Sequence, residues 1–172
     1  MKKYFYMAAL LIVAALTTTS CGSDEPKEKT TATATYFMTF SPDLLNACEG
    51  LILYYKSDNG QNKFEPISST STTWTKTVTS DKFPAEFGVM YKFSTKSESE
   101  LDKEKYDLTC DLNFSLKTSK GASYSNTVTI INNAGVNKDK VVSTIDKLSG
   151  KSIGFKVTKD GIVSQANNLN YD

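Results

Sequence analysis

The sequence contains no histidine and no arginine, so all of its 20 basic residues are lysines. Histidine is the usual proton donor and acceptor near neutral pH, and its absence excludes Ser-His-Asp and Cys-His catalytic sets. Arginine supplies the two-pronged contact that proteins use for phosphate, and no glycine-rich phosphate loop occurs either. We therefore expect neither enzyme activity nor a bound cofactor.

Cysteine is scarce, with Cys21, Cys48 and Cys110 as its three occurrences. None belongs to a Cys-x-x-Cys pair, so neither a zinc site nor a thiol redox motif is indicated, and we expect no metal. A disulfide between Cys48 and Cys110 would close a loop of about 60 residues and stabilise the fold by roughly 4 kcal/mol. Two buried free thiols, which behave as small hydrophobic side chains, are the alternative.

Two groups of acidic and amide side chains invite comparison with catalytic or calcium sites. Carboxylate pairs occur between residues 98 and 104 (Glu98, Glu100, Asp102 and Glu104), but the surrounding run of charges is typical of a solvated loop. Asp58, Asn59 and Asn62 lack the repeated acidic ligands of a calcium loop. A hairpin turn explains this second group better.

Long apolar runs are also missing, because the longest one, Tyr4 to Leu16, falls short of the about 20 residues that span a membrane. Lys2 and Lys3 precede this run, and small polar residues follow it up to Ser20. This order is typical of a secretory signal peptide, here residues 1–20. An ordinary signal with an incidental cysteine after it and a retained N-terminal anchor are the alternatives.

The stretch from Thr18 to Gly22, with Cys21 in it, resembles the lipobox of bacterial lipoproteins, although Thr18 stands where that family usually carries leucine. The resemblance implies that Cys21 carries the lipid that attaches the protein to a membrane. Ser23, Asp24 and Glu25 are similar to the acidic export signal of Bacteroidetes lipoproteins, which implies an outer-membrane position facing the cell surface. Several acyl chains on one cysteine make a stable anchor.

Removal of residues 1–20 from the 172 leaves 152, a length that fits one domain. Lys2 and Lys3 account for two of the 20 basic residues, which leaves 18 against 19 acidic residues and no basic surface to attract nucleic acid. Residues 21–35 are polar and lack apolar periodicity, so we expect a lipidated N-terminus followed by a flexible tether. Residues 36–172 then form the domain.

Strict alternation of apolar and polar residues dominates the chain from Tyr36 onward. The clearest stretch runs from Leu108 to Leu116, where every second residue is apolar. Such a period of two predicts strands with one buried and one solvated face. Similar stretches are 51–56, 74–78, 87–93, 128–130 and 153–157, and turn residues such as Asn59-Gly60, Gly121 and Gly161 separate strands.

One segment has helical spacing instead: Val141, Val142, Ile145 and Leu148 share one face between Asn137 and Ser149. We interpret this short helix as a connector between strands, with a partner-binding helix as the alternative. The whole pattern predicts an all-β fold, an antiparallel sandwich of about eight strands that resembles the immunoglobulin architecture. A lipocalin-like barrel is the alternative fold.

Two classes of function are compatible with these observations. The first is a binding or adhesion module at the cell surface, in which exposed aromatic residues contact a glycan or a protein. Tyr54, Tyr106 and Tyr124 are the candidate contact residues, although each is individually more typical of packing. The second is an accessory subunit of a larger envelope complex, and a carboxylate-dependent hydrolase is a distant third. An exposed aromatic platform would favour binding, and an uncovered strand edge would favour assembly.

Overall fold

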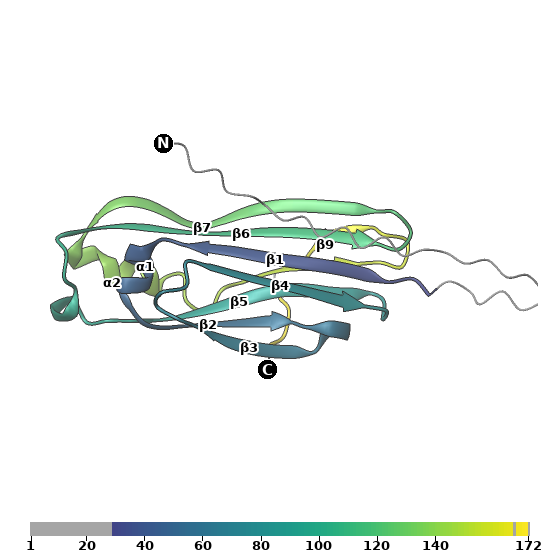
Figure 1. Ribbon diagram of the computed structural model, residues 1–172, viewed down its shortest axis with the longest axis horizontal. Coiled ribbons are helices and arrows are strands. Elements are labelled where there is room, and N and C mark those ends of the chain that lie inside the picture. The colour runs from purple at the N-terminus through teal and green to yellow at the C-terminus, as the bar shows by residue number, and fades with distance from the viewer. Residues whose placement is uncertain (1–28, 167, 172) are drawn as a thin grey trace, which may run out of the picture.

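The protein is a two-layered antiparallel β-sandwich, shown as a computed structural model that describes residues 29–166 and 168–171 (Figure 1). One sheet has four strands in the order β4-β1-β6-β7, and the other has five in the order β3-β2-β5-β8-β9. The sandwich predicted from the alternation is thereby confirmed, and the two sheets do not close into a barrel. The strands are β1 (Ala32–Phe40), β2 (Cys48–Lys56), β3 (Asn62–Ile67), β4 (Thr73–Ser80), β5 (Ala85–Thr95), β6 (Lys105–Thr118), β7 (Ser123–Asn137), β8 (Ser152–Val157) and β9 (Val163–Gln165).

The connectivity around β1 and β2 corresponds to that of an immunoglobulin domain. β1 lies next to β4, as strand B lies next to E, and β3-β2-β5-β8 correspond to C′-C-F-G. The hairpin of β6 and β7 adds to the first sheet, with β6 beside β1 in the place of strand A. The resemblance is therefore one of architecture, with an inserted hairpin.

The strand with the clearest alternation, β6, buries every second side chain from Tyr106 to Thr118, as the sequence predicts. The sandwich itself begins earlier than expected, because β1 starts at Ala32 and pairs there with Ser80 and Thr118. Ala32 and Ala34 are fully buried. Their small side chains alternate with threonines, which gives too weak a hydrophobic signal to distinguish a strand from a tether. The predicted boundary at Tyr36 is thus four residues late.

Two short α-helices and two 3-10 turns connect the strands: α1 (Pro42–Asn46), α2 (Lys138–Asp146), η1 (Asp58–Gly60) and η2 (Glu98–Glu100). Both α-helices lie at the same end of the sandwich (Figure 1). The predicted helix is present as α2, which buries Val141 and Ile145 in the common core and so serves as a connector. Among the described residues, no helix has the length and apolar character to cross a membrane, and the run Tyr4 to Leu16 lies outside them.

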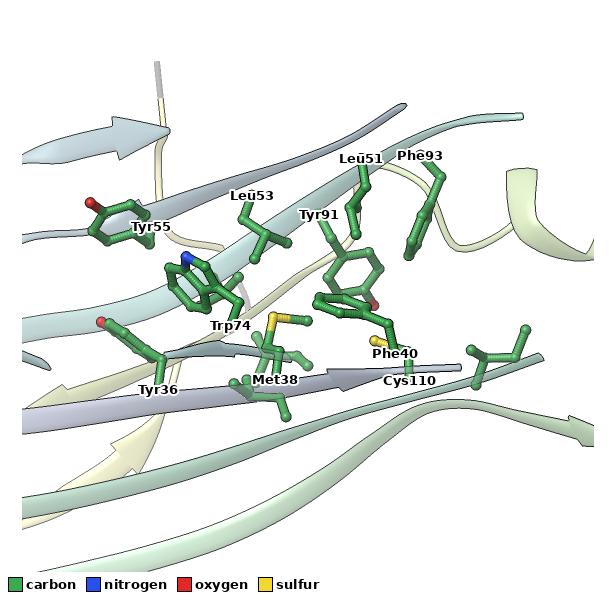
Figure 2. Close-up of a cluster of buried hydrophobic side chains, with 14 of the residues drawn as sticks. Tyr36, Met38, Phe40, Leu51, Leu53, Tyr55, Trp74, Tyr91, Phe93 and Cys110 are labelled. Carbon is green, nitrogen blue, oxygen red and sulfur yellow. The ribbon is translucent and has the colours of Figure 1, made fainter. Parts of the chain in front are cut away.

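The core lies between the two sheets and is rich in aromatic rings. Figure 2 shows Tyr36, Met38 and Phe40 pointing from β1 towards the side chains of β2 and β5 in the facing sheet. Farther along, Phe114 of β6 and Phe155 of β8 stack face to face, with ring centroids 4.2 Å apart. Burial of such rings is the main source of stability in a fold of this size.

The hydroxyl of Tyr36 makes two buried hydrogen bonds that cross this core. Tyr36 stands on the four-stranded sheet, yet its hydroxyl accepts from the Gly88 amide at 2.9 Å and donates to the Lys56 carbonyl at 3.1 Å. The Gly88 amide belongs to β5 and the Lys56 carbonyl to β2. Both lie one residue beyond Tyr55 and Val89, the last pair of residues in the ladder between these two strands. Burial raises the pKa of Tyr36 well above its usual value, so the hydroxyl stays protonated.

A second polar cluster joins the two sheets at the edge formed by β3 and β4. The carboxylate of Glu65 on β3 accepts from the Tyr55 hydroxyl at 2.9 Å, from the Trp74 indole at 2.8 Å and from the Lys76 ammonium. Trp74 and Lys76 belong to β4 in the other sheet. Partial burial alone would raise the pKa of Glu65, but these three donors outweigh it and hold that pKa below its usual value.

Tyr36→Phe should remove about 1–3 kcal/mol from the free energy of unfolding, because it leaves a buried amide and a buried carbonyl without a partner. Urea unfolding followed by tryptophan fluorescence measures this change. Tyr91→Phe is the matched control, since Tyr91 is also buried but its hydroxyl makes no hydrogen bond among the described residues. Equal stability of the two variants would contradict the bridging role of Tyr36.

Glu65→Gln should lower the free energy of unfolding near neutral pH, and this difference from the wild type should disappear in acid. A carboxylate whose pKa is lowered on folding stabilises above its unfolded pKa of about 4.3, and that contribution is lost as the pH falls through the folded pKa. The unfolding free energies of wild type and variant should therefore converge as the pH falls below the lowered pKa of folded Glu65. Glu49→Gln, which alters an exposed carboxylate outside any ion pair of the described residues, should track the wild type throughout.

Candidate functional site

Cys48 and Cys110 are both buried, and the structure has them as free thiols. Cys110 faces the core beside Phe40 and Tyr91 (Figure 2). Burial raises the pKa of the Cys48 thiol to about 12, and it raises that of Cys110 as well. Both side chains are therefore protonated near neutral pH and act as small apolar residues, the second of the two alternatives. The lipid-attachment candidate, Cys21, lies outside the described residues.

Tyr106, one of the three candidate contact residues, is fully buried and therefore unavailable to a partner. Its hydroxyl accepts from the Lys103 amide at 3.0 Å and donates to the Asp102 carboxylate at 2.9 Å. This backward contact at the start of β6 is similar to the tyrosine corner of immunoglobulin-like sandwiches. The expectation of a contact role for Tyr106 was wrong because alternation within β6 turns this ring into the core.

Tyr124 also packs inward. Its ring lies 6.2 Å from that of Phe114 and 5.7 Å from that of Phe155, at the partly open edge of the core near β7. Tyr124 is half-buried, and its ring therefore closes the sandwich between β6 and β8. It contributes packing rather than an exposed platform.

Two of the four carboxylates that invited comparison with a hydrolase, Glu100 and Asp102, hold turns. Glu100 caps η2 by accepting from the Ser97 amide at 2.9 Å, and Asp102 accepts from Asn46 at 2.8 Å as well as from Tyr106. Asp43 accepts from Lys103 and from the Asp107 amide. These hydrogen bonds lower the pKa of the Asp43, Glu100 and Asp102 carboxyls, as expected for structural carboxylates rather than for a raised general acid.

Two of the three side chains compared with a calcium site, Asp58 and Asn59, hold η1 against the end of β4, whereas Asn62 accepts from the Lys56 ammonium at 2.8 Å. Asp58 accepts from the Thr79 amide at 2.6 Å, and Asn59 accepts from the Asp81 amide at 3.0 Å. Asn59 and Gly60 have positive φ angles of 55° and 76°, as the predicted Asn-Gly turn requires. The described part of the chain contains no group of three or more metal-ligating side chains.

Tyr54 is the candidate that the structure places on an exposed face. It points outward from β2, on the side of the five-stranded sheet that faces away from the core, and its direct neighbour on β3 is Phe64. The two ring centroids are 5.9 Å apart, and Phe64 is 65% exposed. Lys92 of β5 completes the group, with its ammonium 4.9 Å from the centre of the Tyr54 ring.

Apolar side chains extend this pair across three neighbouring strands. Ile52 lies opposite both Pro66 and Lys92, and Tyr54 lies opposite Met90, so all of them share the outer face. None of these side chains is fully buried. We name this surface the aromatic patch, consisting of Ile52, Tyr54, Phe64, Pro66, Met90 and Lys92. A contiguous apolar surface of this kind, unlike a single exposed residue, is typical of an interaction site.

Part of this outer face, around Gly88 and Gly154, is covered by the C-terminal segment of the chain itself. A Cβ atom on Gly88 would lie 2.5 Å from the Tyr171 hydroxyl, and one on Gly154 would lie 2.6 Å from Leu169. The two glycines therefore let Tyr171 and Leu169 lie flat on β5 and β8, and both are buried. Lys56 fixes the segment by donating to the Asn170 carbonyl. The segment does not reach the aromatic patch, which stays partly open, as does the ion pair of Glu86 and Lys156.

Lys92 has a charge without an acidic partner. Among the described residues it takes part in no ion pair, whereas Lys156 on the same face pairs with Glu86 at 3.0 Å. An ammonium beside apolar rings attracts a carboxylate more strongly than one in open water does. The aromatic patch therefore combines an apolar surface with one site for an acidic group.

The outer face of the four-stranded sheet has a different character. Cross-strand hydrogen bonds of 3.0 Å join Thr33 to Thr79 and Thr35 to Thr77. Phe37, 37% exposed, stands alone among hydroxyl and amide groups at a shallow hollow of about 480 Å³. Exposed apolar residues that stand singly are normal on protein surfaces, so this face indicates a solvated sheet.

Tyr54 is the one member of the aromatic patch that the sequence predicted as a contact residue, and its neighbours on β3, Phe64 and Pro66, were the hardest to find. The segment from Asn62 to Ile67 alternates poorly and contains a proline, which hides a strand. A signal was nevertheless present in the Asn59-Gly60 turn. A hairpin centred there brings Tyr54 opposite Phe64, because hairpin register follows from the position of the turn.

Comparisons with known proteins return no match: no family model fits the chain, and no curated protein and no solved structure is significantly similar to it.

Proposed function

We propose that this protein is a lipid-anchored module of the outer membrane that binds a protein partner through the aromatic patch at the cell surface. The observation that supports this proposal is the contact between Tyr54 and Phe64, two neighbouring rings on a partly open face of the five-stranded sheet. Aromatic residues and methionine are enriched at protein interfaces, and a few such residues provide most of the binding energy.

The polarity of the patch favours a protein over a glycan. Ile52, Pro66 and Met90 surround the two rings and offer no side-chain hydrogen bond, whereas a sugar carries a hydroxyl on nearly every carbon and needs polar partners. An apolar protein surface with a carboxylate at its rim would match both the rings and Lys92. The glycan alternative remains an outcome that the binding experiment distinguishes.

The proposed anchor fits the direction in which the chain enters the fold. β1 begins at Ala32, at the end of the sandwich away from α1 and α2 (Figure 1). A lipid on Cys21 would therefore hold this end towards the membrane and leave the aromatic patch on the flank. In that orientation a partner in the same membrane or beside the cell can reach the patch.

Phe64→Ala should weaken partner binding by about 30-fold, the equivalent of about 2 kcal/mol, because it removes the most exposed ring of the patch. The measurement is a pull-down from envelope extracts with the acylated protein, followed by titration of the captured protein. Ile162→Ala is the matched control, since Ile162 is 66% exposed but lies in the turn between β8 and β9, outside the patch. Its binding should equal that of the wild type.

The same variants separate the alternatives. A glycan array that gives a signal lost with Phe64→Ala, in the absence of a captured protein, would establish the glycan alternative. If both variants bind the captured protein as tightly as the wild type does, the contact lies outside the aromatic patch. A partner that co-purifies in fixed stoichiometry through the patch would make the protein an accessory subunit of that complex.

Cys21→Ala should move the protein from the membrane fraction to the soluble fraction, because the acyl chains have no other attachment point in the lipobox. Fractionation and immunoblotting measure this, and protease treatment of intact cells tests exposure at the surface. Cys48→Ala serves as the control for loss of a cysteine, and it should leave the protein in the membrane fraction. Sedimentation of the Cys21→Ala variant with membranes would contradict the anchor.

A further inference from the structure

The four edge strands of the sandwich differ in how well they are protected against pairing with another chain. β3 carries Pro66 and Lys63, and β9 has only three residues. The end of β4 is covered by the turn η1. There the side chains of Asp58 and Asn59 accept hydrogen bonds from the backbone amides of Thr79 and Asp81. Proline, lysine, short length and covered amides are the usual means of preventing strand addition. Three edges therefore have such protection.

The fourth edge strand, β7, has none of these devices along most of its length. It is 15 residues long, lies at the end of its sheet, and contains neither a charged residue nor a proline. No described strand pairs with its outer side. Figure 1 shows β7 as the outermost strand of the molecule. Its register with β6 is regular from Ser123 to Thr129, and the two register shifts lie beyond that segment.

Side-chain hydrogen bonds hold this regular segment in an extended conformation. The Thr127 hydroxyl donates to Asn113 at 2.6 Å, and the Thr129 hydroxyl donates to Asp111 at 2.7 Å. Both partners lie on β6, so these contacts leave the outer edge of β7 open. A strand that is already ordered loses little conformational entropy when another strand pairs with it.

The sequence of the segment is complementary to itself about Asn126. In an antiparallel pair of two copies centred there, Asn126 faces its own counterpart, Ser125 faces Thr127, and Tyr124 faces Val128. Opposite residues share a face, so hydroxyls meet hydroxyls on the solvated side, and the half-buried Tyr124 and Val128 meet on the inner side. No like charges oppose each other, because the segment carries none.

We infer that the protein forms a two-fold symmetric dimer in which β7 of one copy pairs antiparallel with β7 of a second copy through residues 123–129. The two four-stranded sheets then form one continuous sheet, and the last open edge is closed. A two-fold axis perpendicular to that sheet leaves both five-stranded sheets on the same side. Each dimer would thus present two aromatic patches in one direction, which increases the avidity for a partner that has two sites.

Asn126→Lys tests the dimer because it places two positive charges opposite each other at the axis. Asn126 is exposed and makes no side-chain hydrogen bond among the described residues, so the fold should tolerate the change. In sedimentation of the full mature protein in detergent, the wild type should have the mass of two chains and the variant the mass of one. Ser115→Lys, an equal charge change one strand inward on β6, should keep the dimer. A monomeric wild type, or a dimer that survives Asn126→Lys, would overturn the inference.

Asn126→Cys supplies an independent test in membranes. Facing Cα atoms in an antiparallel pair are about 4.5–5.5 Å apart, within the range that a disulfide spans. Mild oxidation should therefore give a covalent dimer of this variant, and none of Ser115→Cys, while the native Cys48 and Cys110 stay buried. Equal cross-linking of the two variants, or none, would contradict the dimer. A cross-link to a different protein would mean that β7 pairs with another polypeptide, which also overturns it.

Discussion

The hydroxyl of Tyr36 connects the two sheets at the point where the ladder between β2 and β5 ends. It satisfies the Gly88 amide and the Lys56 carbonyl, which would otherwise be buried without partners. Because the ring must cross the core to reach them, this contact fixes how far apart and in what register the sheets lie. Trp74 and Phe114, which come from the strands on either side of β1, pack against the same ring.

The end of the ladder between β2 and β5 also determines which part of the outer face of the five-stranded sheet stays open. Beyond Tyr55 and Val89, the glycines at positions 88 and 154 admit the C-terminal segment onto the outer face of the five-stranded sheet. Side chains at those positions would push Tyr171 and Leu169 away. The segment therefore covers the face around these glycines and leaves the aromatic patch around Tyr54 and Phe64 partly open.

Several carboxylates of the kind that could serve in an active site instead make hydrogen bonds that hold the fold together. Glu65 joins β3 to β4, Asp102 fixes Tyr106, and Asp58 covers the edge of β4. Two features of the described surface lack an internal partner and are apolar or uncharged over most of their extent: the aromatic patch and the edge of β7. Both features favour association with other chains, and they lie on different sheets. Binding of a partner and pairing of two copies can therefore occur together.

The sequence by itself determined the fold class, because alternation in segments such as Leu108–Leu116 depends only on which face of a strand is buried. It also determined the turn at Asn59-Gly60 and the helix at Val141 and Ile145, which are local features. Only the tertiary structure decided that the half-buried Tyr54 lies on a partly open face beside the exposed Phe64. The reason is that alternation tells which residues share a face, whereas pairing between distant strands and the course of the C-terminal segment decide whether that face is covered.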